Sequence, residues 1–514
     1  MAETTILANG TVLTCDAMDH CGRIHLLIGG RHILALSRNL DSLRKENPDA
    51  TILDVKEKLI LPGFVNAHFH GESFLLRRLT NGIHFGLWNG LVPLRQAVDK
   101  LLDRSSYDDV RRLYRAAYRA HLKSGTTCVG EFPAPYDDEA FLRVIESIAE
   151  SGVATIVALQ NWDQIRKVQA MRENKPRAAI SLGREEEFTV YSIEKLSQAA
   201  KELRTPLLAH VGEQRSDVET VRKNFQKSTV ALLNSFNAFA AGTILVHANH
   251  AGEDEVQIIH DAGGAVVVCP RSTAWKQTGY PALRHLAKHH VRLALGTDWG
   301  EVDMLEEMRF MSTLPLLVAG LPMFPATEIL KMATIHGAQA LGFSEELGSI
   351  EVGKRATLVM FDVADIRLPV LSQAPTASEV ADLVIHHLTT RDITDVVIDG
   401  EFRVREREAA GESDIMAELH ALARKFIPHH EQTQQGPAEQ GANVLPFIAE
   451  VRSPQGETEG FESGFAEKAR QATIVEIAEK PVNPLINRPK PARDPIKPEL
   501  PPNTKRVFGE DDDV

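Results

Sequence analysis

The stretch 61–70 reads LPGFVNAHFH, an apolar run that ends in two histidines one residue apart. In an extended strand, residues i and i+2 point to the same side, so His68 and His70 can bind one ion together. A hydrolytic zinc site needs three protein ligands and one open coordination position. This strand therefore predicts a metal site whose remaining ligands lie elsewhere in the chain.

Three later strand-like runs each end in a side chain that can bind a metal. The run 206–210 ends in His210, the run 243–247 in His247 and the run 292–298 in Asp298. The carboxyl ends of parallel strands carry the functional groups of a β/α barrel, so the recurrence predicts such a barrel. Strands are expected near 61–70, 126–132, 153–160, 178–182, 206–213, 243–249, 264–270 and 291–298, with amphipathic helices between them.

The predicted fold class is α/β, a (β/α)8 TIM-type barrel with a small β-sandwich domain. The catalytic barrel is expected over 61–344 and the sandwich over the two chain ends, 1–60 and 345–410, where short strands alternate with turn residues. Residues 411–427 predict one helix. The segment 428–514 is rich in Pro and Glu, so we expect it to be largely extended or disordered.

Composition narrows the class of protein. The 514 residues are 43% hydrophobic and 25% charged, as in a soluble globular protein, and the net charge of −13 argues against a nucleic-acid partner. The four cysteines are scattered, and no secretory signal or membrane-spanning run is evident, so a cytoplasmic location without membrane contact is expected.

The four strand-end ligands predict one divalent metal ion per subunit. His68, His70, His210 and Asp298 form an N₃O set that suits Zn²⁺, with Fe²⁺ as the alternative. A lone histidine at a strand end is more often an ordinary polar residue than a ligand, but several candidates at successive strand ends favour a shared site. Zinc would lower the pKa of a bound water to about 7 and so produce hydroxide at neutral pH.

Two further residues are candidates for proton transfer. Glu213 follows His210 by three residues and is expected to carry a proton from the water to the leaving group, the alternative being a solvated loop carboxylate. His247 can hydrogen-bond the water or the developing oxyanion. Asp298 can share in proton removal while it binds the metal.

These motifs resemble the amidohydrolase superfamily, in the branch of adenosine-derivative and guanine deaminases and triazine hydrolases. The resemblance covers about residues 5–425 and rests on the ordered segments 62–70, 210–213, His247, 269–272 and 295–298. It implies a mononuclear metal-dependent hydrolase whose ligands match His68, His70, His210 and Asp298. Glu213 and His247 match its proton-transfer residues. No barrel strand offers an evident lysine for a carbamate bridge, so two-metal members fit less well.

The candidate substrate contacts are Trp88, Glu131, Arg184 and Trp299. Trp88 could stack on a flat heterocycle or be a core residue, and Glu131 could receive a cationic amidine or guanidine group or form a structural salt bridge. Arg184 lies in a segment, 183–192, that replaces the branch's usual His-Ala-Pro. Trp299 follows Asp298 where small residues are common, and we expect it to narrow the pocket.

The predicted function is that of an aminohydrolase. Metal-bound hydroxide is expected to attack an sp² carbon of a nitrogen-rich small molecule or N-heterocycle and to release ammonia or an amine. The same ligands could serve hydrolytic dechlorination or the cleavage of an amide, urea or guanidine C–N bond. A non-catalytic assembly protein is the third interpretation. Family resemblance implies a homodimer or a larger homo-oligomer.

Overall fold

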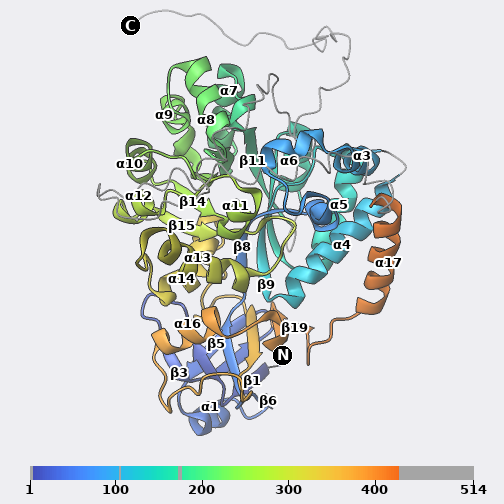
Figure 1. Cartoon of the computed structure of the whole chain (residues 1–514). Coiled ribbons are helices and arrows are strands. Elements are labelled where there is room, and N and C mark those ends of the chain that lie inside the picture. Colours follow the sequence, from blue (N-terminus) through green and yellow to red (C-terminus); the bar gives the residue numbers. More distant parts are fainter. Residues whose placement is uncertain (1–3, 104–105, 172–175, 428–514) are drawn as a thin grey trace, which may run out of the picture.

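The computed structural model describes residues 4–103, 106–171 and 176–427 (Figure 1). The predicted tail, 428–514, lies outside the described residues. In the described part, a barrel of parallel strands stands on a smaller β domain to which both ends of this part contribute (Figure 1).

The predicted (β/α)8 barrel is confirmed. Each barrel strand pairs in parallel with the next one along the chain, and Asp298 and Trp299 pair with Phe69 and His70 of the first strand, which closes the sheet. The eighth strand is interrupted at Gly296 and Thr297, so it consists of two short pieces. The strands are β8 (Phe64–His70), β9 (Thr126–Glu131), β10 (Ala154–Leu159), β11 (Arg177–Arg184), β12 (Leu207–Val211), β13 (Thr243–His247), β14 (Ala265–Val268), β15 (Arg292–Leu295) and β16 (Asp298–Trp299).

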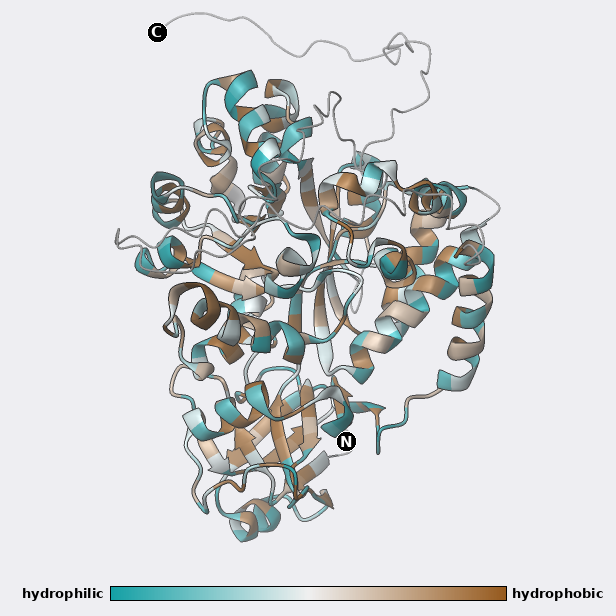
Figure 2. Cartoon of the chain, in the orientation of Figure 1, coloured by the Kyte–Doolittle hydropathy of each residue, from teal (hydrophilic) through white to brown (hydrophobic). Residues whose placement is uncertain are grey.

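Helices surround the barrel because each presents one apolar stripe to the strands and a polar face to solvent. Figure 2 shows hydrophobic residues concentrated on the strands and on the helix faces that pack against them. These helices are α2 (Ser73–Leu76), α3 (Val92–Leu101), α4 (Tyr107–Lys123), α5 (Asp138–Ser151), α6 (Trp162–Gln169), α7 (Val190–Glu202), α8 (Arg215–Phe225), α9 (Thr229–Ser235), α10 (Glu253–Asp261), α11 (Pro270–Lys276), α12 (Leu283–Lys288), α13 (Met304–Ala319), α14 (Ala326–Met332) and α15 (Ile335–Ala340).

The small domain draws on both ends of the described chain, as predicted, and consists of one sheet of N-terminal strands and one sheet that combines the two ends. One sheet has the order β5-β4-β1-β6 and the other β19-β18-β17-β7-β2-β3. The strands are β1 (Thr4–Ala8), β2 (Thr11–Leu13), β3 (Cys21–Arg23), β4 (His25–Gly29), β5 (His32–Ser37), β6 (Thr51–Asp54), β7 (Lys58–Pro62), β17 (Leu358–Asp362), β18 (Ile393–Ile398) and β19 (Glu401–Val404), with helices α1 (Leu40–Glu46) and α16 (Ala377–His386). Helix α17 (Glu412–Phe426) packs against α4 (Figure 1).

The predicted single strand over 61–70 is wrong, because the run divides between the two domains. Leu61 and Pro62 end β7 in the small sheet, and β8 begins at Phe64 in the barrel. Gly63 joins them where a Cβ atom would lie 2.1 Å from the Thr127 side chain, so only glycine fits without displacement. The helices of the described residues include none that is long and apolar enough to span a bilayer.

Close packing of β8 and β9 generates a test. A Cβ atom on Gly130 would lie 2.3 Å from the backbone oxygen of Ala67. Because this oxygen belongs to the backbone, no change of side-chain rotamer can relieve the clash. We expect Gly130→Ala to lower the free energy of unfolding by about 1–3 kcal/mol, measured by urea denaturation. Gly90→Ala is the matched control because nothing lies within 4 Å of its Cβ position. Equal stability of the two variants would contradict the expected clash.

Candidate metal centre

Four predicted ligands meet at the carboxyl ends of the barrel strands. His68 Nε2 lies 3.3 Å from His210 Nε2 and 3.5 Å from Asp298 Oδ1, and His70 Nε2 lies 3.6 Å from the same oxygen. Donor atoms arranged tetrahedrally around zinc at its usual bond lengths are about 3.4 Å apart. The ring of His68 therefore faces His210, and the residues present fit a single divalent ion.

The protonation and orientation of these groups suit metal binding. Burial and then the neighbouring His68 lower the pKa of His70 to about 3, so its ring is neutral at physiological pH. Its Nδ1 lies 2.9 Å from the backbone oxygen of Phe132, which leaves Nε2 for an ion. Asp298 Oδ1 is buried and has no hydrogen-bond partner among the described residues. A bound cation would satisfy this oxygen.

Two residues at these barrel strand ends have strained backbone conformations. Asp298 and His247 have φ angles of 58° and 77°, in the left-handed region that residues other than glycine seldom adopt. The Asn66 side chain holds the strand end before Asp298, because its Oδ1 accepts from the Thr297 N–H at 3.0 Å and its Nδ2 donates to the Thr297 hydroxyl at 2.7 Å. The interrupted eighth strand thus turns Asp298 toward the histidines of β8.

A second group of donors adjoins the first. His247 Nε2 lies 3.6 Å from Glu213 Oε1 and 3.9 Å from Asp298 Oδ2. All three side chains are buried, and both nitrogens of His247 lack a hydrogen-bond partner among the described residues. The structure therefore brings the predicted proton-transfer residues together with the predicted ligands.

Sequence reasoning missed Lys276. This lysine is buried at the end of α11, and its Nζ donates to Asp298 Oδ2 at 2.5 Å and to Glu213 Oε1 at 3.0 Å. Ser272 donates to the same Asp298 oxygen at 2.8 Å. The spacing from Ser272 to Lys276 is i to i+4, one face of a helix, and this signal could have identified the lysine.

Arg184, a predicted substrate contact, is engaged by carboxylates of the protein itself. Its guanidinium donates to Glu186 at 2.6 Å, to Glu213 Oε2 at 2.6 Å and to Asp217 at 2.8 Å, so carboxylates within the protein engage it. Burial raises the pKa of Glu213, but Lys276, His247 and Arg184 outweigh burial and hold that pKa below its ordinary value. Glu213 is therefore an ionised carboxylate that is held at both oxygens.

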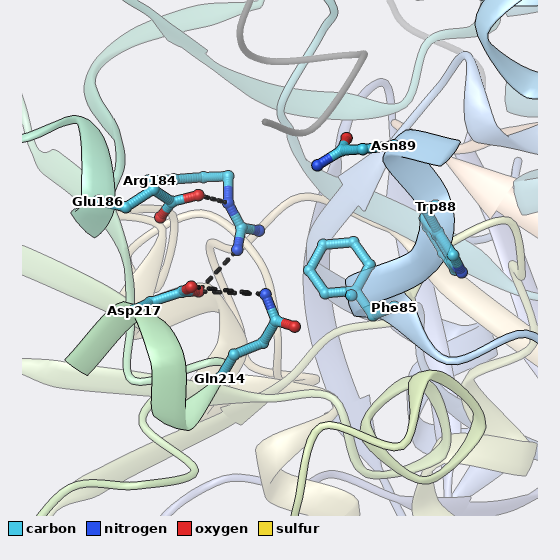
Figure 3. Close-up of a pocket in the computed structure, with 8 residues that line it drawn as sticks. Phe85, Trp88, Asn89, Arg184, Glu186, Gln214 and Asp217 are labelled. Atoms are coloured by element: carbon cyan, nitrogen blue, oxygen red, sulfur yellow. Dashed lines mark hydrogen bonds and ion pairs between the residues drawn. The ribbon is translucent and has the colours of Figure 1, made fainter. Parts of the chain in front are cut away.

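Aromatic side chains cover the centre. The 3₁₀ segment η2 (Phe85–Gly90) places Phe85 beside Arg184 and Lys276, with the two cations 4.9 Å and 4.7 Å from its ring centre. Trp88 lies 5.0 Å from Trp299, and both rings are buried. A small pocket opens between this segment and the Arg184–Asp217 pair (Figure 3). The predicted substrate contacts Trp88 and Arg184 line this pocket.

Glu131 lies apart from this pocket. Its fully buried carboxyl group accepts from the Gly71 N–H at 2.8 Å and from the Tyr118 hydroxyl at 3.1 Å. Burial and then the adjacent Glu72 raise the pKa of Glu131 well above its ordinary value. The enclosed carboxyl group supports the backbone behind His70, while the predicted contact of Glu131 with a cationic substrate group stays a prediction.

Comparison with known proteins agrees with this geometry. The model of the amidohydrolase family matches residues 59–403. A 5-methylthioadenosine/S-adenosylhomocysteine deaminase of Syntrophomonas wolfei is 28% identical over 398 residues, which cover 73% of this chain and 89% of that protein. A 5'-deoxyadenosine deaminase of Methanobrevibacter smithii is 24% identical over 425 residues, covering 78% and 92%.

Solved structures share the fold. An adenosine deaminase from Xanthomonas campestris with bound zinc superposes with a TM-score of 0.73 at 21% identity, covering 82% of this chain and 98% of that one. The zinc complex of atrazine chlorohydrolase from Arthrobacter aurescens gives a TM-score of 0.68 at 18% identity, covering 82% and 100%. At these identities the likeness concerns the fold.

The buried ion network generates a test. Arg184→Met removes the cation that Glu213 and Asp217 share, which leaves Glu213 with Lys276 alone and Asp217 without this ion pair inside the protein. We expect the free energy of unfolding to fall by about 3–5 kcal/mol, as when one partner of a buried ion pair is removed. Urea denaturation measures this loss. Arg367→Met, which removes an exposed ion pair with Asp365, should leave stability unchanged. A stable Arg184→Met variant would show that Arg184 does not balance this network.

Proposed function

This chain is a member of the amidohydrolase family, and on that premise we propose that it is a zinc-dependent aminohydrolase that releases ammonia from a small N-heterocycle. One observation carries the proposal: His68, His70 and Asp298 offer ligand atoms that lie within 4.8 Å of one another, and His210 Nε2 lies 3.3 Å from His68 Nε2. The buried carboxylate of Glu213 adjoins this cluster through Asp298 and His247. Relatives named as deaminases of adenosine derivatives support the choice of reaction.

His68, His70, His210 and Asp298 would hold one ion per subunit. Three imidazole nitrogens and one carboxylate oxygen suit Zn²⁺, and Fe²⁺ is the alternative. When bound, such an ion polarises water and lowers its pKa toward neutrality.

Glu213 is the proposed proton carrier. Because it is ionised, it can accept a proton from the attacking water and return the proton to the leaving nitrogen. Arg184 and Lys276 fix its two oxygens, so the acceptor atom has a defined position. His247 Nε2 lies 3.6 Å from Glu213 Oε1 and can hydrogen-bond an oxygen that gains negative charge during the reaction.

Aromatic residues support a flat substrate. Trp299 lies beside His70, with ring centres 6.3 Å apart, and Trp88 packs on Trp299 at 5.0 Å. Rings of this kind stack on heteroaromatic substrates and exclude water from the reacting atoms.

Ammonia release tests the proposed activity. The protein, saturated with zinc, is incubated with aminated purines, adenosine derivatives and aminated or chlorinated triazines, and ammonia and chloride are measured. We expect ammonia from at least one aminated heterocycle and loss of that activity after chelation, with recovery on addition of zinc. Chloride release without ammonia, or a protein that binds no divalent metal, would overturn the proposal.

Substitution of Glu213 tests its role. Glu213→Gln keeps the shape of the side chain but cannot accept the proton, so we expect kcat to fall by about 10²–10⁴-fold with zinc content unchanged. Glu253→Gln, on the exposed N-terminal turn of α10, is the matched control and should retain full activity. If Glu213→Gln kept wild-type kcat, another residue would have to carry the proton.

A further inference from the structure

The site contains a second set of potential metal ligands that the metal assignment above does not use. Glu213, His247 and Asp298 each offer a ligand atom, and these atoms all lie within 4.8 Å of one another. Asp298 belongs to both sets, since Oδ1 faces His68 and His70 whereas Oδ2 lies 3.9 Å from His247 Nε2. Two cations could therefore be held side by side, bridged by one carboxylate.

Lys276 places its ammonium group in this second set. Its Nζ is 2.5 Å from Asp298 Oδ2 and 3.0 Å from Glu213 Oε1, which are the same two oxygens that approach His247. His247 is buried, and its Nε2 has no hydrogen-bond partner among the described residues. An imidazole nitrogen aimed at two carboxylate oxygens is a donor arrangement that suits a metal ion.

The ammonium group is enclosed on its remaining side. Its Nζ lies 4.7 Å from the ring centre of Phe85 and 5.7 Å from that of Trp88. The lysine ammonium group therefore lies among two carboxylates and two aromatic rings. This is the environment of a charged group that acts as a fixed cation.

We propose that Lys276 is a built-in cation that occupies the place of a second metal ion between Glu213, His247 and Asp298, and thereby restricts the centre to one divalent ion. The inference rests on the proposed metal centre. An ammonium group carries one positive charge on a side chain anchored by α11, so it neutralises the facing carboxylates and cannot be lost to a chelator. It also holds Glu213 Oε1 where a proton acceptor is needed, which makes Lys276 a positioning residue.

Metal stoichiometry tests the proposal. Metal-free protein is titrated with Zn²⁺ by calorimetry, and bound zinc is counted by elemental analysis after dialysis. We expect one zinc per chain for the wild type. Lys276→Met has a side chain of similar length without charge and frees the three ligands, so we expect two zinc ions per chain. Lys276→Arg keeps a cation there and should bind one.

Two controls locate the second ion. Adding Glu213→Gln to Lys276→Met removes one ligand and should return the stoichiometry to one. Lys331→Met removes a partly buried lysine that pairs with Asp19 at 2.6 Å, far along the chain from this site, and should leave the stoichiometry at one.

The outcomes separate the two proposals. A folded Lys276→Met protein that still binds one zinc overturns the inference and leaves the proposed function intact. Two zinc ions in the wild type at excess metal also overturn it, and this measurement does not depend on the folding of any variant. A wild-type protein that binds no divalent ion overturns the proposed function itself.

Discussion

The carboxylate of Asp298 is the group on which the rest of the centre depends. One oxygen faces the histidines of β8, and the other accepts from Ser272 and Lys276. A buried carboxylate needs compensation on every side, because the protein interior solvates charge poorly. Its position follows from barrel closure, since Asp298 and Trp299 pair with Phe69 and His70, where the last strand meets the first.

Charge balance extends outward from this group through Glu213. Lys276 holds one Glu213 oxygen, Arg184 holds the other, and Arg184 in turn pairs with Asp217 and Glu186. Such a network fixes the position of each member, because moving one leaves another charge unpaired. The result is a preorganised site in which the Glu213 carboxylate is held in place by the protein itself.

The segment that follows β8, residues 77–90, covers the charged groups of the site. Phe85 packs on the two cations, and the indole N–H groups of Trp88 and Trp299 donate to Ile83 and Thr80 within the same segment. Arg77 anchors this segment to the last strand by donating to the Gly300 oxygen at 2.7 Å. These aromatic side chains therefore shield the charged groups from water, and this shielding strengthens the electrostatic interactions between those groups.

The strand ends in His68, His70, His210, His247 and Asp298 were recognisable from the sequence, because period-two alternation and a terminal ligand are local patterns. The barrel and the expected convergence of the ligands followed from these strand ends, and the composite small domain followed from the short strands and turn residues at the two ends. The spacing of Lys276 from Ser272 indicates a shared helix face, but it does not show which carboxylates the lysine meets. That contact and the engagement of Arg184 depend on which helix end and which loop close over the barrel. The enclosure of Glu131 likewise depended on tyrosines from a neighbouring helix. Local sequence thus determined which side chains stand at the strand ends, whereas tertiary packing alone decided which charges face one another, because pairing between buried ions depends on distances that no sequence spacing records.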